Sequence, residues 1–341
     1  EIIAIYRDEG WLPLSSCSTT DPPRHSKVRG FLETLFKVDR IRRVTPMIEQ
    51  VARDLLDDLG SRTEAAFVRE FAHPFPMVVI ANLLGVPSAD IGQFKRWSDA
   101  IVEPFSMMAS RERRIECARL VVDMQHYFAD MIEARRKHPG DDFISEALAY
   151  RDRNGECFDM QELMTLITID LLASGNETTT AAISSGMKLL IEDPCAMAQV
   201  SADPTLVPVL IEEILRLESP AQGMFRQCSE DATLNNVALP RGSLLNIRFG
   251  GANRDAARYP NPNAIDLTRR KPGSHLAFGM GRHVCVGAGL ARAELISAFS
   301  QLFARYKGFA LAPGAPVPEY QPSFFGRNLD EIHINLLPRT L

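Results

Sequence analysis

The sequence lacks closely spaced cysteines, an excess of basic residues and long apolar runs. Its six cysteines form no CxxC pair and lie more than thirty residues apart, which argues against a disulfide framework or a zinc knuckle and favours reduced thiols in the cytoplasm. The net charge is -5, so we expect no nucleic-acid partner. No apolar run reaches the roughly 18 to 20 residues that span a bilayer, and no signal peptide is recognisable, so we expect no membrane contact.

The chain does contain enough apolar sequence for a large core. Its 341 residues are 45% hydrophobic and 24% charged, which is ordinary for a globular protein of one large domain or two smaller ones. A chain of this size can bury a core with an internal pocket for a cofactor. The opening stretch "EIIAIYRDEG" reads like the middle of a domain, so we expect the natural N-terminus to lie further upstream.

Apolar residues recur at helical spacing through most of the first 220 residues and again near the C-terminus. Asp159 is a good N-cap and Pro194 a stop for a helix of roughly 34 residues, about 50 Å long, which we expect to run through the core. Residues 232–255 alternate and carry turn residues, which predicts short strands. The sequence therefore predicts a mainly α protein with small β-sheets in one domain. The expected helices cover 44–60, 113–140, 159–193, 204–220 and 288–306.

A lone cysteine lies in the glycine-rich stretch "HLAFGMGRHVCVGAGLARAEL", just before the last predicted helix. Its glycines permit positive φ angles and a close approach of the backbone to something flat or bulky. The helix begins near Ala288, so its positive end and free N–H groups favour a thiolate at Cys285, which would be a metal ligand or a nucleophile. These residues alone leave alternatives open. They are an inert buried cysteine, a hydrolytic pair with His283, and a zinc site with His275 and His283 that would lack a sulfur-rich second half.

The same stretch resembles the heme-binding loop of the cytochrome P450 family, whose pattern is F-G-x-G-x-H-x-C-x-G-x-x-L-A-R-x-E. The resemblance implies heme b (iron protoporphyrin IX) as cofactor, with Cys285 as the axial thiolate ligand of the iron and O2 as co-substrate. Phe278 would pack near the sulfur, and the glycines would leave room for the porphyrin. The matching residues are Phe278, Gly279, Gly281, His283, Cys285, Gly287, Leu290, Ala291, Arg292 and Glu294.

The stretch "SGNETTT" in the long predicted helix is a second point of resemblance. By itself, Gly175 indicates close helix packing, at a cost of about 1 kcal/mol relative to alanine. The family pattern is A/G-G-x-D/E-T-T, and Ser174 here replaces the usual small residue. The resemblance implies that Gly175 opens a groove for dioxygen and that Glu177 and Thr178 form an acid–alcohol pair that delivers protons.

Glu213 and Arg216 are one helical turn apart in "EEILR", a spacing that is typical of an ordinary surface ion pair. Their position ahead of the cysteine loop matches the buried E-x-x-R of the family, which ties the helix to the irregular segment beneath the heme. The family usually adds a third residue, Arg or His, where this chain has Ala264. The sequence therefore predicts an incomplete triad.

His25 and Arg29 in "DPPRHSKVR" are four residues apart, which places both on one face of a helix. Either they belong to a solvated basic face or, as the family's D-P-P-x-H-x-x-x-R implies, they hold a heme propionate. Arg226 and His283 match further propionate contacts of the family.

The resemblance also places one stripe of the long helix toward the substrate. Asp170 in this stripe is unusual, because family members mostly carry an apolar residue there. Its carboxylate is either paired or turned to water, or it contacts a polar group of the substrate together with Ser174. The candidate substrate-contacting residues are Asp170, Ala173, Ser174, Gln222, Met224, Phe324 and Phe325.

On these matches the chain is identified as a member of the cytochrome P450 family, with residues 1–341 as a single domain around a buried heme. The resemblance implies that an N-terminal sheet region and a lid loop between Gly10 and Asp21 are missing from this numbering. It implies a monomeric, cytoplasmic monooxygenase that takes electrons from ferredoxin and ferredoxin reductase and inserts one oxygen atom by hydroxylation. We expect the substrate to be a secondary metabolite of antibiotic biosynthesis, such as a polyketide or an aromatic acid, free or bound to a carrier protein. The alternative is a non-catalytic heme sensor or carrier of the same fold.

Overall fold

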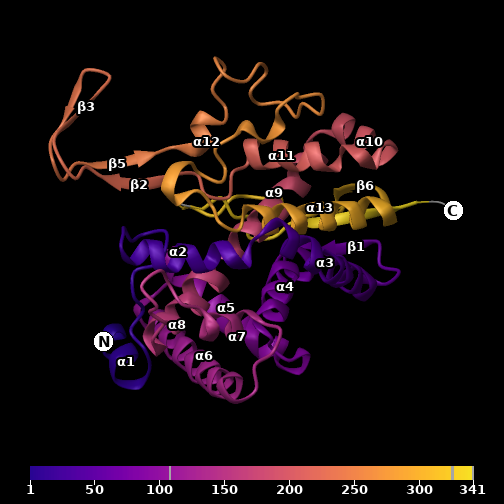
Figure 1. Ribbon diagram of the computed structural model, residues 1–341. Coiled ribbons are helices and arrows are strands. Elements are labelled where there is room, and N and C mark those ends of the chain that lie inside the picture. The colour runs from indigo at the N-terminus through magenta and orange to yellow at the C-terminus, as the bar shows by residue number, and fades with distance from the viewer. Residues whose placement is uncertain (107–108, 324–325, 340–341) are drawn as a thin grey trace.

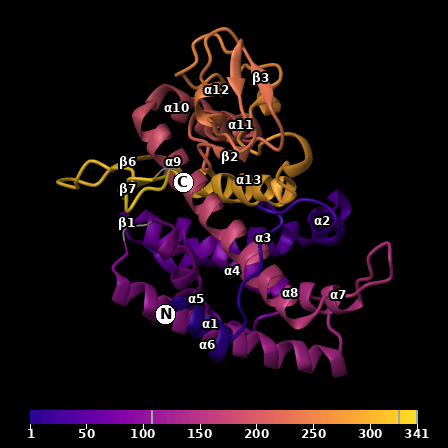
Figure 2. The same ribbon diagram turned by 90° about the vertical axis from the view of Figure 1, so that its left-hand side faces the viewer.

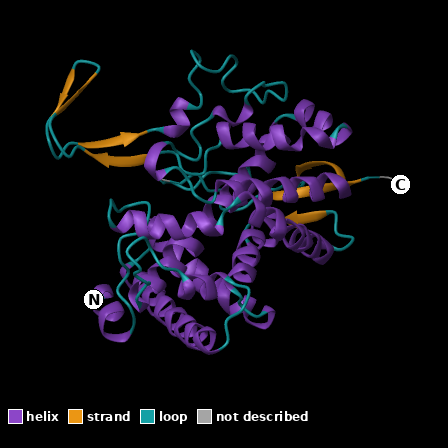
Figure 3. Ribbon diagram, viewed as in Figure 1, coloured by secondary structure: helices purple, strands orange, loops and turns teal. Residues whose placement is uncertain are grey.

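The computed structural model describes residues 1–106, 109–323 and 326–339, which form a mainly helical protein with three small antiparallel sheets (Figures 1 and 3). Helices and small sheets in this proportion confirm the fold class that the sequence predicts. The α-helices in this part of the chain are α1 (Ile2–Glu9), α2 (Arg24–Leu35), α3 (Val38–Leu59), α4 (Pro74–Leu84), α5 (Ile91–Val102), α6 (Arg111–Lys137), α7 (Phe143–Ala149), α8 (Met160–Thr165), α9 (Ser174–Glu192), α10 (Pro194–Ala202), α11 (Val207–Leu217), α12 (Phe249–Ala252) and α13 (Ala288–Arg305).

The strands of the described residues fall into three sheets, and the β3-β4 pair lies in the chain between β2 and β5. One sheet has the order β1-β7-β6, and the other two are the pairs β2-β5 and β3-β4, all antiparallel. The two pairs project from the helical body, as Figure 1 shows. The strands are β1 (Glu64–Ala66), β2 (Met224–Gln227), β3 (Ala232–Leu234), β4 (Val237–Leu239), β5 (Leu244–Ile247), β6 (Tyr306–Leu311) and β7 (His333–Pro338).

The long helix predicted over 159–193 is present, but it contains a widened turn. It begins at a capping box in which Asp159 and Glu162 bind each other's backbone N–H groups. It continues through α8, the π-helical segment η4 (Leu166–Ala173) and α9, and it ends before Pro194. The π-helical segment was not foreseen, because apolar periodicity does not distinguish it from an α-helix. Such segments occur mostly at functional sites, and this one precedes the "SGNETTT" stretch directly.

Helix α9 lies in the middle of the molecule and packs against α4, α11 and α13 (Figure 2). Gly186 lets two of these neighbours approach, since a Cβ atom there would lie 2.7 Å from Ile214 and 2.8 Å from Phe299. Ile214 on α11 and Phe299 on α13 are fully buried. This packing fixes where α13 begins, and therefore where the cysteine loop that precedes α13 lies relative to α9.

The other predicted helices are confirmed with small shifts of their ends. The segments 44–60, 113–140, 204–220 and 288–306 correspond to α3, α6, α11 and α13. Helix α3 stops at Gly60, which has a φ of 60° that disfavours other residues. All six cysteines lie within the described residues and are free thiols. Within the described residues, none of the helices has the length and apolar character that crossing a bilayer requires.

Candidate functional site around Cys285

The loop from Phe278 to Gly287 is a tight cradle for the Cys285 sulfur. The Cys285 N–H donates to the Phe278 carbonyl oxygen at 2.9 Å, which closes the loop on itself. Gly279 and Gly281 have φ angles of 68° and 80°, a region in which a side chain would be strained. A Cβ atom on Gly287 would lie 4.0 Å from the Cys285 sulfur. The glycines therefore serve the backbone turn and the space beside the sulfur, as the sequence predicts.

The Cys285 residue is solvent-accessible, although protein atoms surround the sulfur on most sides. Burial raises the pKa of the thiol, while the Gly287 N–H and the charges of Arg29 and Arg292 lower it. Burial is the largest of these effects. The thiolate at Cys285 stays a prediction, because a bound metal cation displaces the proton of a coordinating thiol.

Beside the cysteine loop, α2 supplies a cluster of nitrogen donors. The His25 ring packs edge-on against His283, with 4.7 Å between the ring centroids. The Arg29 guanidinium donates to the Val284 carbonyl oxygen at 2.5 Å and to Glu33 at 2.8 Å. His25 and Arg29 both lie at the cysteine loop, on one face of α2 as their spacing predicts.

Several of these donors are buried without a hydrogen-bond partner. Within the part of the chain that the structure describes, the Nε atom of Arg24, Nε2 of His25 and Nδ1 of His283 have none. An unsatisfied buried polar atom costs free energy, so such a cluster points to an acceptor supplied from outside the chain. Carboxylates have the matching chemistry. Burial and the neighbouring cations also lower the pKa of His25.

The middle of the long helix has an accessible face. Ser174 is exposed although residues 171–172 and 179–180 on either side of it are buried, and a Cβ atom on Gly175 would meet no other atom within 4 Å. The Thr178 hydroxyl donates to the Ser174 carbonyl oxygen at 2.9 Å. Gly175 thus borders open space rather than a packed helix, and the groove for dioxygen that the resemblance implies there stays a prediction.

Glu177 and Thr178 are adjacent in sequence but have different partners. The Glu177 carboxylate accepts a hydrogen bond from the Asn328 side chain. Burial raises the pKa of Glu177, and the Asp99 carboxylate raises it further, while His73 and Asn328 lower it. Asn328 is a partner that sequence reasoning missed, because it comes from a loop 151 residues further along the chain.

The E-x-x-R pair is buried, and its third partner is present. Arg216 and Glu213 are fully buried and joined by hydrogen bonds of 2.9 and 2.8 Å. Arg269 donates to the same Glu213 carboxylate at 2.7 Å, and both guanidinium groups lie over the ring of Tyr259. The predicted incomplete triad is thus wrong. The third cation lies five residues beyond Ala264, whose carbonyl oxygen accepts from Arg216 at 2.9 Å.

A second ion-pair cluster joins α11 to the cysteine loop. The Glu212 carboxylate accepts from Arg292 at 2.6 Å and lies 2.9 Å from the Nε2 atom of His275. The Arg292 guanidinium lies over the Phe278 ring, 4.5 Å from its centroid. These partners overcome the effect of burial and lower the pKa of Glu212 to about 2. Sequence reasoning missed Glu212. Two adjacent glutamates on an otherwise apolar helix could have indicated that each of them has a buried cationic partner.

The remaining predicted residues are not joined to this cluster by the contacts of the described residues. Arg226 lies on β2 and donates to the Phe225 carbonyl oxygen at 2.8 Å. Gln222 donates to the Ser219 carbonyl oxygen at 2.6 Å, and Met224 is half-buried on β2. Ala173 is half-buried at the end of η4. Phe324 and Phe325 lie outside the described residues.

Asp170 is paired with the main chain of the N-terminal region. Its carboxylate accepts a hydrogen bond of 2.8 Å from the Cys17 N–H. Burial raises the pKa of Asp170 to about 6, although this hydrogen bond and the charge of Arg24 lower it. The sequence left open whether the Asp170 carboxylate is paired, turned to water or in contact with substrate. The structure shows that its Oδ1 atom is paired.

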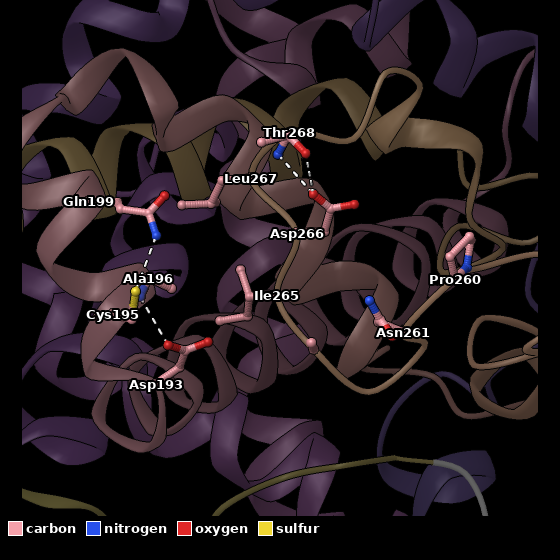
Figure 4. A pocket seen from close by; sticks show the side chains of 11 residues that line it. Asp193, Cys195, Ala196, Gln199, Pro260, Asn261, Ile265, Asp266, Leu267 and Thr268 are labelled. Atoms are coloured by element: carbon pink, nitrogen blue, oxygen red, sulfur yellow. Dashed lines mark hydrogen bonds between the residues drawn. The ribbon is translucent and has the colours of Figure 1, made fainter.

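A pocket of about 390 Å³ lies elsewhere, between α10 and residues 260–268 (Figure 4). Both aspartates that line this pocket accept hydrogen bonds from residues two or three positions further along the chain. Asp193 accepts from the Ala196 N–H at 2.9 Å, and Asp266 accepts from the Thr268 hydroxyl at 2.7 Å. Cys285 and the α2 donors do not line it. We therefore place the functional site at the cysteine loop and not at this pocket.

The fold and the site together define a class of protein. It is mainly helical, and a glycine-rich loop holds one cysteine sulfur beside nitrogen donors that have no hydrogen-bond partner. A model of the cytochrome P450 family matches residues 14–332. The 6-deoxyerythronolide B hydroxylase of Saccharopolyspora erythraea is 35% identical over 322 residues, which are 94% of this chain and 78% of that protein. The chain belongs to the cytochrome P450 family and is a cytochrome P450 monooxygenase.

Solved structures of the family agree with this fold. The structure of P450BioI in complex with an acyl carrier protein ligated to hexadec-9Z-enoic acid has a TM-score of 0.86 at 30% identity, and the match covers 98% of this chain and 84% of that chain. The cytochrome P450 PksS of the bacillaene polyketide synthase of Bacillus subtilis 168 has a TM-score of 0.87 at 29% identity, with coverage of 99% and 82%.

The family implies a heme held by a thiolate, and the residues present fit it. The cysteine in the glycine cradle would supply the soft thiolate donor. A Cβ atom on Gly287 would meet only the Cys285 sulfur, at 4.0 Å, and one on Gly175 would meet no atom within 4 Å. The unpaired nitrogens of His25 and His283 match the two carboxylates that a heme b carries. These are observations on the protein atoms themselves, independent of the family pattern.

Arg269 offers a test of the three-residue cluster under the loop. We expect Arg269→Gln to lower the free energy of unfolding by about 1 to 3 kcal/mol, because the buried Glu213 carboxylate loses one of two charged partners. Chemical denaturation measures this difference. The matched control is Arg270→Gln, since Arg270 is the exposed neighbour. Equal stability of the two variants would contradict a structural role of Arg269.

Because Glu294 on α13 is buried, we expect the free energy of unfolding to depend on pH. Burial raises the pKa of Glu294 to about 8 despite a hydrogen bond with Thr179. Between the unfolded pKa of about 4.3 and this value, the native state keeps a proton that the unfolded state has lost. We therefore expect this group to lower the unfolding free energy by about 1.4 kcal/mol for each unit of rising pH in that range. Glu294→Gln removes this slope, which denaturation at several pH values detects; parallel profiles would argue against it.

Proposed function

We propose that Cys285 is the axial ligand of a heme b iron and that this monooxygenase hydroxylates an organic substrate with O2. Electrons come from a ferredoxin and its ferredoxin reductase. The observation that carries the proposal is the cradle of Gly279, Gly281 and Gly287 around the one sulfur, placed beside the unpaired nitrogens of His25 and His283. When bound, the heme supplies activation of O2 with two electrons.

The chain's own residues have separate tasks in this proposal. His25, Arg29 and His283 are proposed to hold a heme propionate. Arg226 is proposed as a further propionate contact, although its guanidinium donates to the Phe225 carbonyl oxygen in the structure. Phe278, Gly279 and Gly287 shape the loop, and Glu213 and Arg216 fix the segment beneath it. All of these tasks are binding and positioning, so their loss should lower heme affinity before it changes the reaction.

Gly175, Thr178 and Glu177 form the oxygen side of the site in this proposal. The Thr178 hydroxyl can both donate and accept a proton, and it lies on the accessible face beside Gly175. The raised pKa of Glu177 lets its carboxyl group hold a proton closer to neutral pH than a free glutamate does. A sensor or carrier of heme has no need of such a pair, which favours catalysis.

The substrate that we propose is a secondary metabolite, such as a polyketide or an aromatic acid, free or bound to a carrier protein. The similar proteins that act in a polyketide synthase or bind an acyl carrier protein support this range. Ala173, Ser174, Gln222 and Met224 are the described residues that we place at the substrate. A role in antibiotic biosynthesis and a cytoplasmic location fit the same range, and the six free thiols suit a reducing compartment.

Reconstitution with hemin tests the proposal directly. We expect the reduced protein treated with carbon monoxide to show the absorption band of a thiolate-ligated heme. We also expect spin-state shifts with polyketide, aromatic-acid or carrier-bound candidates, and O2 consumption with ferredoxin and its reductase. A histidine-type band, or no band, would refute the proposed site. A thiolate-type band without electron consumption in the presence of bound substrate would favour the non-catalytic heme protein instead.

A further inference from the structure

One side chain from the C-terminal region reaches the Glu177 carboxylate on α9. The side-chain amide of Asn328 donates to the Oε1 atom of Glu177, across 151 residues of chain. Both residues are half-buried, so water competes only partly for this hydrogen bond. The contact ties α9 to the loop between β6 and β7.

The loop holds Asn328 in place from both sides. Arg327 donates its backbone N–H to the Pro220 carbonyl oxygen at 3.0 Å and forms an ion pair with the buried Glu218. On the other side, Leu329 is buried in the core. The Asn328 amide is therefore held in place by the fold of the loop and not by the carboxylate alone.

The charged groups that act on Glu177 belong to two other elements. His73 precedes α4 and Asp99 lies on α5, and the Nε2 atom of His73 is 3.0 Å from an Asp99 oxygen. Lys95, one turn before Asp99, lies 3.0 Å from the same carboxylate. Burial raises the pKa of Glu177. His73 lowers it, Asp99 raises it, and the hydrogen bond from Asn328 lowers it. Among the described residues, Asn328 is the one hydrogen-bond donor to this carboxylate.

A hydrogen bond to one oxygen decides where the proton of a carboxyl group lies. A protonated carboxyl group has one O–H donor and one carbonyl oxygen, and an amide N–H binds the carbonyl oxygen. Because Oε1 of Glu177 accepts from Asn328, a proton on this group lies on Oε2. Without the amide, either oxygen could carry the proton, since the terminal torsion of a glutamate is broad.

We propose that Asn328 is a positioning residue for proton delivery, which holds the Glu177 carboxyl group in one orientation with its proton on Oε2. In each delivery the bond between Oε2 and its proton breaks, the proton passes to the oxygen side of the site, and Oε2 regains a proton from water. Asn328 itself neither gains nor loses a proton. The inference rests on the proposed function, because it presupposes that Glu177 delivers protons there.

Two amide side chains of the same loop give a matched pair of variants. Asn328→Leu replaces the donor to Glu177 by an apolar group of similar shape. Gln321→Leu removes an amide that donates to the Asp330 carboxylate at 3.1 Å instead. The measurement is the infrared absorption of the holoenzyme across pH, in which a protonated carboxyl group shows a C=O stretching band. The band of Glu177 is the one that Glu177→Gln removes.

In Asn328→Leu we expect the Glu177 band to move to higher frequency, because its C=O group loses a hydrogen-bond donor. We also expect the titration midpoint of this band to rise by about one pH unit, since the amide stabilises the charged carboxylate. Gln321→Leu should leave both values unchanged. Asn328→Asp tests the same position without a change of size, and a second carboxylate beside Glu177 should also raise the midpoint.

Turnover then shows whether this orientation matters for proton delivery. We expect the product formed per electron to fall severalfold in Asn328→Leu, while the carbon monoxide band stays as in the wild type. In a Glu177→Gln background the same substitution should cause no further fall, because Asn328 acts through Glu177.

Three results would overturn the inference. An unchanged band and midpoint in both Asn328 variants would show that the amide does not hold this carboxyl group. A shifted band with wild-type product per electron would show that the position of the proton does not matter. An equal fall in the Glu177→Gln background would show that Asn328 acts elsewhere. Each result leaves the proposed function standing, since that proposal is judged by the carbon monoxide band and the O2 consumption of the wild-type protein.

Discussion

Cys285→Ser is expected to abolish the thiolate-type carbon monoxide band and to reduce substrate oxidation below detection. A serine hydroxyl is a poor ligand for heme iron, and it lacks the electron donation by which a thiolate favours cleavage of the O–O bond. The cradle is built around this one atom: the glycines at 279 and 281 turn the loop, and Gly287 leaves space beside the sulfur. The measurement is the absorption spectrum of the reduced, hemin-reconstituted protein with carbon monoxide.

Cys157→Ser is the matched control for this variant. Cys157 is likewise an exposed free thiol, but it lies in the loop before α8. It should keep both the spectrum and the activity of the wild type. A normal band in Cys285→Ser would mean that another residue ligates the iron, and the assignment of the site would be wrong.

Thr178→Ala is expected to uncouple electron use from product formation. Loss of a positioned proton donor typically costs a factor of about 10² or more, so most electrons should leave as hydrogen peroxide and little product should form. Heme content and the carbon monoxide band should stay as in the wild type, because Thr178 contacts its own helix backbone and not the cysteine loop. The measurement is the ratio of product and peroxide to electrons consumed.

Two further variants make this test specific. Thr178→Ser keeps a hydroxyl group and should restore most of the coupling. Thr179→Ala removes the neighbouring hydroxyl, which is buried and donates to the Gly175 carbonyl oxygen at 3.1 Å, and it should remain coupled. Tight coupling in Thr178→Ala would instead assign proton delivery to another group.

The sequence by itself determined the helices, the cysteine loop and the family. Helices such as α3 and α13 follow from apolar periodicity with local stop signals, and the Phe278–Cys285 turn follows from glycines a few residues away. All of this information lies within one or two turns of chain, so a single sequence contains it. The same local spacing brought His25 and Arg29 to one face of α2.

Only the tertiary structure decided which distant groups meet. Arg269 completes the cluster of Glu213 from 56 residues away, Asn328 binds Glu177 across 151 residues, and Asp170 binds the Cys17 N–H across 153. Each of these contacts depends on how helices and loops pack against one another, and no local pattern contains that geometry.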